Sequence, residues 1–216
     1  MFQTEVSAWG DLPELLEAQA DADPDFADWD FLFVGYRWNT VSSFGEIASI
    51  IASHWQYARS GRLESGSSYS SIVLIGYSLG TLGIRHLVAL PGPCSASYAL
   101  DAESCYLFGS PSFGSNLARL PISRFFPIAR ALRPDSTELV ALANATKNAN
   151  SHSTTWPTVQ LLVAEDDWIA GFGKLVYLLG FPGDQVPRQI LGGHLGMLNI
   201  KSLNDDVVEE LRAALR

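Results

Sequence analysis

The chain has 216 residues, of which 47% are hydrophobic, and its formal net charge is -9 at pH 7. This length and composition predict one soluble domain over residues 1–216 with one sizeable core. The negative charge and the lack of basic clusters argue against nucleic acid or an anionic membrane surface as a partner. No run of eighteen apolar residues occurs, and the first residues lack the basic and apolar regions of a secretory signal, so a cytoplasmic protein is expected.

The pattern of apolar residues predicts alternating helices and strands. Residues 43–59 form a predicted helix, because their isoleucines recur at helical spacing and mark a face that packs on a sheet. Residues 60–71 are rich in glycine and serine, which predicts a connection. An apolar β-branched run then begins at Ile72 and predicts a strand, and a helix is expected over residues 81–90.

This strand ends in the sequence Gly76-x-Ser78-x-Gly80, which places Ser78 at the turn between a strand and a helix. Such a tight turn strains the serine backbone and exposes its hydroxyl, and the two glycines let neighbouring chains approach without a Cβ clash. The same pentapeptide also occurs by chance, and Ser78 would then be an ordinary turn residue. The flanking strand and helix favour a nucleophile.

A serine nucleophile needs a histidine to take its proton and a carboxylate to hold that histidine. The apolar residues 158–164 predict another strand, which is followed directly by Glu165, Asp166 and Asp167. His194 lies further along, in the flexible sequence Gly-Gly-His-Leu-Gly. Simpler interpretations are a solvated strand end for the acidic residues and a polar loop for the histidine. The chain order serine, aspartate, histidine is that of one of the folds that carry a catalytic triad.

With these motifs the chain resembles the α/β-hydrolases of the lipase and esterase type over nearly its whole length. The resemblance implies a mostly parallel sheet flanked by helices. It also implies that Ser78 is the nucleophile, His194 the base and Asp167 the acid. In that family the acid follows a Gly-x-x-Asp pattern, in which alanine replaces the glycine here, and Asp166 is the alternative acid.

The same resemblance implies that the fold is shortened at its N-terminus. Residues 8–16 resemble the first helix after the turn that supplies half of the oxyanion hole, and residues 30–36 resemble the next strand. No His-Gly pair, which ends the preceding strand in this family, comes before Ser78. The backbone N–H of Leu79 is one expected oxyanion donor, and Phe2 is the candidate for the second. The missing strand would leave backbone groups of its two neighbours unpaired or force those neighbours together.

Residues 113–156 lie between predicted strands and are numerous enough for a small helical cap. Ligands of this fold enter above the carboxyl ends of the strands, so Phe113 is a candidate pocket residue. Tyr77 and Trp168 are further pocket candidates because they adjoin the nucleophile and the acid. The phenylalanines of the insertion fit equally well with packing of the cap onto the sheet.

Cys94 and Cys105 allow a disulfide, although two buried thiols are the simpler interpretation. No Cys-x-x-Cys or His-Glu-x-x-His spacing and no phosphate-binding glycine motif occurs, so we expect no metal and no cofactor. The expected partner is a small-molecule ester or acyl compound.

The expected activity is hydrolysis of a carboxylic ester through an acyl-enzyme on the serine. A thioesterase or an acyltransferase would use the same triad, because the pocket and not the triad selects the substrate. The alternative from another class is a hydrolase-fold binding protein that is catalytically weak or inactive because it lacks the oxyanion strand.

Overall fold

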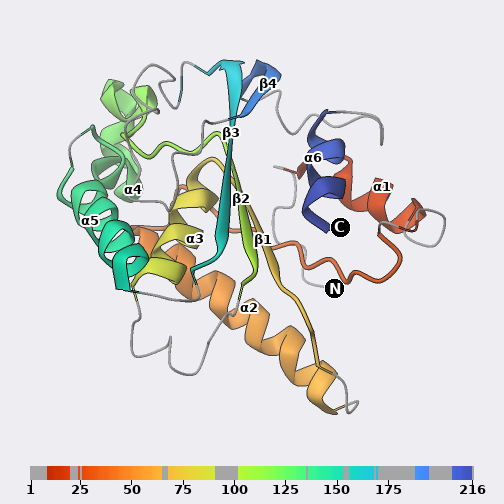
Figure 1. Cartoon of the computed structure of the whole chain (residues 1–216). Coiled ribbons are helices and arrows are strands. Elements are labelled where there is room, and N and C mark those ends of the chain that lie inside the picture. The colour runs from red at the N-terminus through yellow and green to blue at the C-terminus, as the bar shows by residue number, and fades with distance from the viewer. Residues whose placement is uncertain are drawn as a thin grey trace.

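The described elements are helices and parallel strands (Figure 1). The computed structural model describes residues 9–19, 24, 26–64, 68–90, 102–134, 136–152, 156–167, 169, 188–194 and 206–215. Their elements are α1 (Leu12–Gln19), α2 (Phe44–Glu64), β1 (Val73–Tyr77), α3 (Leu79–Ala89), β2 (Ser104–Phe108), the 3-10 helices η2 (Asn116–Arg119) and η3 (Pro121–Phe125), α4 (Pro127–Ala131), α5 (Thr137–His152), β3 (Thr158–Asp166), β4 (Arg188–Gly193) and α6 (Asp206–Leu215). None of the described helices combines the length and the apolarity that crossing a bilayer requires.

The four described strands form one sheet in the order β1-β2-β3-β4, and all neighbours are parallel. In this register Gly76 pairs with Leu107, and Leu107 pairs with Leu161. The pairing of β3 with β4 shifts between Ala164 and Asp166, at the carboxyl end of β3. Because the strands are parallel, the residues that follow them meet along one edge of the sheet.

Helices cover both faces of this sheet, α2 and α3 on one side and α1 and α6 on the other (Figure 1). Successive side chains of a strand point to opposite faces. Leu107 and Leu161 accordingly pack in a cluster with residues of α3, whereas Phe108 and Leu162 pack in a second cluster with residues of α1 and α6. Burial on both faces explains why these strands are nearly continuous apolar runs in the sequence.

The residues between β2 and β3 form several short helices. The last of them, α5, packs against α3, and Leu142 of α5 shares a buried cluster with Leu82 of α3 and Ile128 of α4. Ahead of α4, Phe126 contacts Trp38, with ring centroids 4.6 Å apart. The insertion therefore extends the helical layer on one face of the sheet and reaches the chain segment ahead of α2.

The strand expected at residues 30–36 is absent. These residues have irregular backbone, and no backbone hydrogen bond joins residues 31–36 to any other described residue. Between them and β1 lies a cavity of about 1200 Å³, which is lined by every residue from 28 to 36 and from 68 to 80. Successive side chains of a strand point to opposite faces, so a cavity on one face would be lined by every second residue. This cavity is lined by consecutive residues and therefore borders the backbone edge of β1. The expectation was wrong because no described strand lies beside residues 30–36 to complete a ladder.

Cys105 in β2 is a free, buried thiol, and burial raises its pKa to about 12. Cys94 lies outside the described residues. The interior position of Cys105, with an apolar neighbourhood in the cluster around Leu107, is that of a structural cysteine.

Candidate active site

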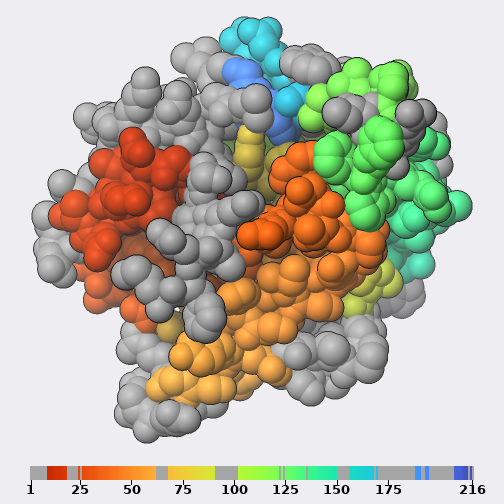
Figure 2. Space-filling view, turned by 180° about the vertical axis from the view of Figure 1, so that it is seen from behind, coloured from red at the N-terminus to blue at the C-terminus, as the bar shows by residue number. Residues whose placement is uncertain are grey.

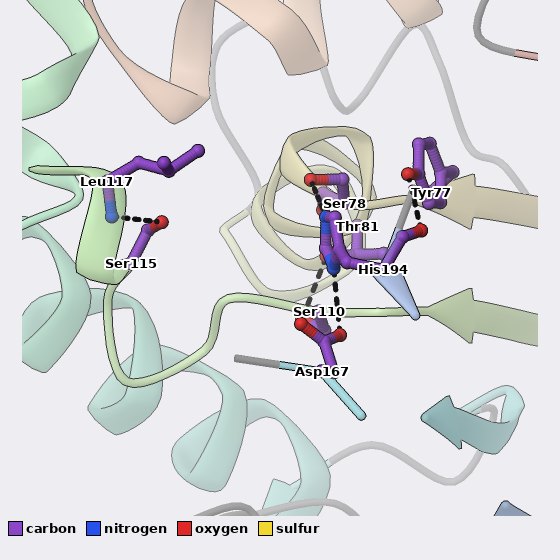
Figure 3. Close-up of polar contacts among 8 residues, drawn as sticks. All are labelled: Tyr77, Ser78, Thr81, Ser110, Ser115, Leu117, Asp167 and His194. Carbon is purple, nitrogen blue, oxygen red and sulfur yellow. Dashed lines mark hydrogen bonds and ion pairs between the residues drawn. The ribbon is translucent and has the colours of Figure 1, made fainter. Parts of the chain in front are cut away.

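The parallel strands bring polar residues together at one edge of the sheet (Figure 3). Ser78 follows β1, Ser110 lies two residues beyond β2, Asp167 follows β3 and His194 follows β4. In an open parallel sheet this carboxyl edge is where ligands bind. Four residues far apart in the sequence thus converge through strand topology.

Three of these side chains form a hydrogen-bonded line (Figure 3). Nε2 of His194 lies 2.8 Å from Oγ of Ser78, and Nδ1 of His194 lies 2.8 Å from Oδ2 of Asp167. A carboxylate only accepts hydrogen bonds, so Nδ1 carries the imidazole proton and Nε2 is free to accept from the serine hydroxyl. The side chains of His194 and Asp167 are 3% and 0% exposed, so water does not compete for their contact.

The two candidate acids occupy different environments. Asp166 is the last residue of β3 and is exposed. Asp167 leaves the strand, and its N–H donates to the carbonyl of Ala164 at 3.3 Å, while its carboxylate is buried against His194. The structure therefore brings Asp167, and not Asp166, into the line of hydrogen bonds.

Ser78 lies in a strained turn. Its φ is 48° and its ψ is -122°, and among the described residues it is the one non-glycine with a positive φ. Its N–H donates to the carbonyl of Phe108 at 2.8 Å, which anchors the turn to β2. A Cβ on Gly76 would lie 2.8 Å from Cδ1 of Ile84 and 3.1 Å from Cα of Thr81, so glycine is what lets the chain fold back this closely.

A buried chain of polar groups supports this turn. Oγ1 of Thr81 lies 2.6 Å from the carbonyl oxygen of Ser78 and 2.8 Å from Oγ of Ser110. The hydroxyls of Ser110 and Ser112 are 2.8 Å apart, and the Arg85 guanidinium donates to Ser112 at 2.8 Å. Arg85 is 2% exposed, and burial lowers its pKa to about 10. These hydrogen bonds link the serine turn, α3 and the turn after β2 into one unit.

Tyr77 joins the serine turn to the histidine. Its hydroxyl donates to the backbone carbonyl of His194 at 2.8 Å, and the two rings lie with centroids 5.4 Å apart. Burial, and to a smaller extent the negative charge of Asp167, raise the pKa of Tyr77 to about 12, so the hydroxyl keeps its proton. Tyr77, a sequence-based pocket candidate, lines the cavity, and its hydroxyl faces the histidine backbone.

The first turn of α3 presents a backbone donor beside the serine. Leu79 is the first residue of α3, so its N–H has no acceptor within the helix, and a helix N-terminus favours negative charge. Leu79 and Ser78 line the same cavity. The other expected donor, Phe2, lies outside the described residues, and so does Trp168. Phe113 is half-buried and is not among the residues that line the cavity.

The cavity connects the serine with a mainly apolar wall. In the space-filling view, yellow atoms of the region around β1 are visible in a recess beside the orange segment ahead of α2 (Figure 2). Apolar side chains that line the cavity together with Ser78 include Leu117, Leu120, Phe126 and Ile169. Within the described part of the chain, no three His, Cys, Asp or Glu residues gather as a metal-binding group would require.

No protein-family model and no curated protein matches the sequence. Solved structures do match. Phospholipase PlaB from Legionella pneumophila, in its complex with thio-NAD, is 17% identical with a TM-score of 0.54, and the match covers 74% of this chain and 35% of that chain. A second structure of PlaB gives 17% identity and a TM-score of 0.53 over 76% of this chain and 37% of that one. The lin2722 gene product from Listeria innocua is 10% identical, with a TM-score of 0.51 over 78% of this chain and 65% of that chain.

These similarities, together with the parallel sheet and its flanking helices, show the fold of the chain. The chain has the α/β-hydrolase fold. It spans little more than a third of the PlaB chains and about two thirds of the Listeria innocua chain. At these identities the likeness concerns the fold, and the chemistry has to be argued from the residues of this chain.

Proposed function

We propose that this protein is a serine hydrolase that cleaves carboxylic esters. The observation that carries the proposal is the hydrogen-bonded line from Oγ of Ser78 through the His194 imidazole to the buried carboxylate of Asp167. A serine at a strained turn, a neutral imidazole that accepts its proton and a carboxylate that fixes the imidazole tautomer are the parts that nucleophilic acyl transfer needs.

The first half of the reaction forms an acyl-enzyme. Oγ of Ser78 attacks the ester carbonyl carbon, and its proton passes to Nε2 of His194. The carbonyl oxygen becomes an oxyanion within reach of the Leu79 N–H, at the positive end of α3. As the intermediate collapses, His194 gives its proton to the departing alcohol, and the acyl group stays on Ser78. Asp167 remains ionised and stabilises the imidazolium.

The second half releases the acid. His194 takes a proton from a water molecule, whose oxygen attacks the acyl carbon, and the proton is then returned to Oγ of Ser78. Attack by another alcohol in place of water would give acyl transfer, and a thioester would enter the same path. The mainly apolar cavity wall beside Ser78 favours an apolar acyl or alcohol group.

Labelling with a fluorophosphonate tests this proposal, because the reagent phosphonylates only an activated serine. We expect rapid modification of the wild-type chain, located at Ser78 by mass spectrometry, and none in Ser78→Ala or His194→Ala. The matched control is Ser53→Ala, which removes an exposed hydroxyl on α2 and should leave labelling unchanged. A folded wild-type chain that stays unlabelled, and that hydrolyses no p-nitrophenyl ester, would instead indicate a non-catalytic binding protein with this fold.

A further inference from the structure

Tyr36 has a polar side chain that lines the cavity and has no role in the triad chemistry. It is the last residue of the irregular stretch that faces β1, and it lines the cavity together with Ser78, Leu79 and Gly80. We infer that the Tyr36 hydroxyl is the second donor of the oxyanion hole and acts beside the Leu79 N–H. The inference rests on the proposed hydrolase activity and names a catalytic residue that it requires.

Position is the first argument. Oη of Tyr36 lies 3.5 Å from the point that a Cβ on Gly80 would occupy, so the hydroxyl sits against the first turn of α3. The same turn begins with Leu79, whose N–H is without a helical acceptor. The Tyr36 hydroxyl and the Leu79 N–H thus both lie at the first turn of α3, and a helix N-terminus favours an anionic oxygen.

Chemistry is the second argument. Burial raises the pKa of Tyr36 well above its usual value, so the phenol keeps its proton throughout the pH range of an assay. No hydrogen bond to a described residue occupies this hydroxyl, so its proton is available to a ligand oxygen. Tyr36 donates a hydrogen bond only; the proton stays on the phenol, and the proton balance of the triad is unchanged.

Preorganisation is the third argument. The Tyr36 ring packs against the buried cluster that includes Val41, Phe44 and Leu79. Leu79, which carries the other donor, belongs to the same cluster, so one packed core fixes the positions of both donors. Donors that are fixed before the reaction contribute most to the stabilisation of a developing charge. Tyr36 thereby takes the role for which Phe2 is the candidate from the sequence.

The variant Tyr36→Phe tests this role, because it keeps the ring and its packing and removes the donor. With a p-nitrophenyl ester as substrate, we expect kcat to fall by about 10²- to 10³-fold and KM to change little. Tyr106→Phe is the matched control: Tyr106 is half-buried in β2 and does not line the cavity, so this variant should keep wild-type kcat.

Phenylboronic acid separates an oxyanion donor from a structural residue. Its boron adds to the serine oxygen and places a boron-bound oxygen where the oxyanion would be, so it mimics the tetrahedral intermediate. We expect Tyr36→Phe to weaken phenylboronic acid in parallel with kcat. A Tyr36→Phe enzyme that retains kcat and phenylboronic acid affinity, or loses activity only through KM, overturns the inference and leaves the proposed function standing. A wild-type chain without turnover or labelling refutes the proposed function itself.

Discussion

Asp166 and Asp167 are adjacent carboxylates, and the backbone geometry determines which of them binds His194. Asp166 still belongs to β3 and faces solvent, whereas Asp167 turns inward once the ladder with β4 shifts register. The sequence could place an acid at the end of this strand, because strand ends are visible in the apolar pattern. Which of two neighbours turns inward depends on the local register, which composition does not encode.

Substitution of these two aspartates gives a paired prediction. Asp167→Asn should lower kcat for a p-nitrophenyl ester by about 10⁴-fold, because an amide no longer fixes the productive tautomer of His194. Asp166→Asn removes the same charge from an exposed side chain and should change kcat by less than about twofold. Steady-state kinetics of both variants provide the measurement. A larger loss in Asp166→Asn than in Asp167→Asn would reverse the assignment.

Two tyrosines show what residue-level motifs miss. The sequence makes Tyr77 a candidate only because it adjoins Ser78, but its hydroxyl donates to the carbonyl of His194, 117 positions away. Tyr36 was part of an expected strand and carried no role. Contacts of this kind follow from how β1, β4 and the segment ahead of α2 are arranged in space. A single sequence contains no periodicity or spacing that reports them.

At the scale of elements, the apolar pattern gave accurate strands and helices near the serine. The expected helix over 81–90 is α3 at Leu79–Ala89, and the expected strand over 158–164 is β3 at Thr158–Asp166. The expected first helix over 8–16 is α1 at Leu12–Gln19. The bounds differ because local sequence signals define helix ends poorly. The error at residues 30–36 has another origin, because a strand exists only through its partner and residues 30–36 lack one among the described residues.

Substitution of Gly76 tests how tightly β1 and α3 are joined. Gly76→Ala would press a methyl group against the backbone of Thr81, with 3.1 Å to Cα and 3.2 Å to N, and should destabilise the fold by about 1–3 kcal/mol. Gly61→Ala is the control: a Cβ there meets nothing within 4 Å, and alanine in a helix should stabilise by up to about 1 kcal/mol. Urea unfolding measures both. Equal effects at the two positions would contradict the tight packing of the serine turn.

At the scale of the whole molecule, the parallel sheet with helices on both faces agrees with the α/β architecture that the sequence predicted. The sequence also left two outcomes open for a missing strand: unpaired backbone groups or a forced approach of its neighbours. Among the described residues the first outcome is found, since no backbone hydrogen bond joins residues 31–36 to β1 across the cavity that both line. Phe31 and Phe33 on one side of the cavity and Ile75 and Tyr77 on the other all pack against the cluster around α1 and α6, so the core joins the two sides without a strand ladder.

The outer edge of β1 can be assigned residue by residue. The N–H of Ser78 donates to the carbonyl of Phe108, and the carbonyl of Ile72 accepts from the N–H of Glu103, so both residues face β2. Within a strand the backbone groups of successive residues point alternately to the two sides. The backbone groups that face the cavity therefore belong to Val73, Ile75 and Tyr77.

This alternation determines how the strand exchanges its amide protons with heavy water. The amides of Leu74 and Gly76 are shielded by β2 and should exchange at least about tenfold more slowly than those of Ile75 and Tyr77, which open to the cavity. Residue-resolved deuterium exchange followed by NMR would give this comparison within a single strand. Equal protection of Ile75 and Gly76 would contradict an open edge. If the alternation is present, the amides on one side of β1 have the protection of a surface loop, while those on the other side have the protection of a paired strand.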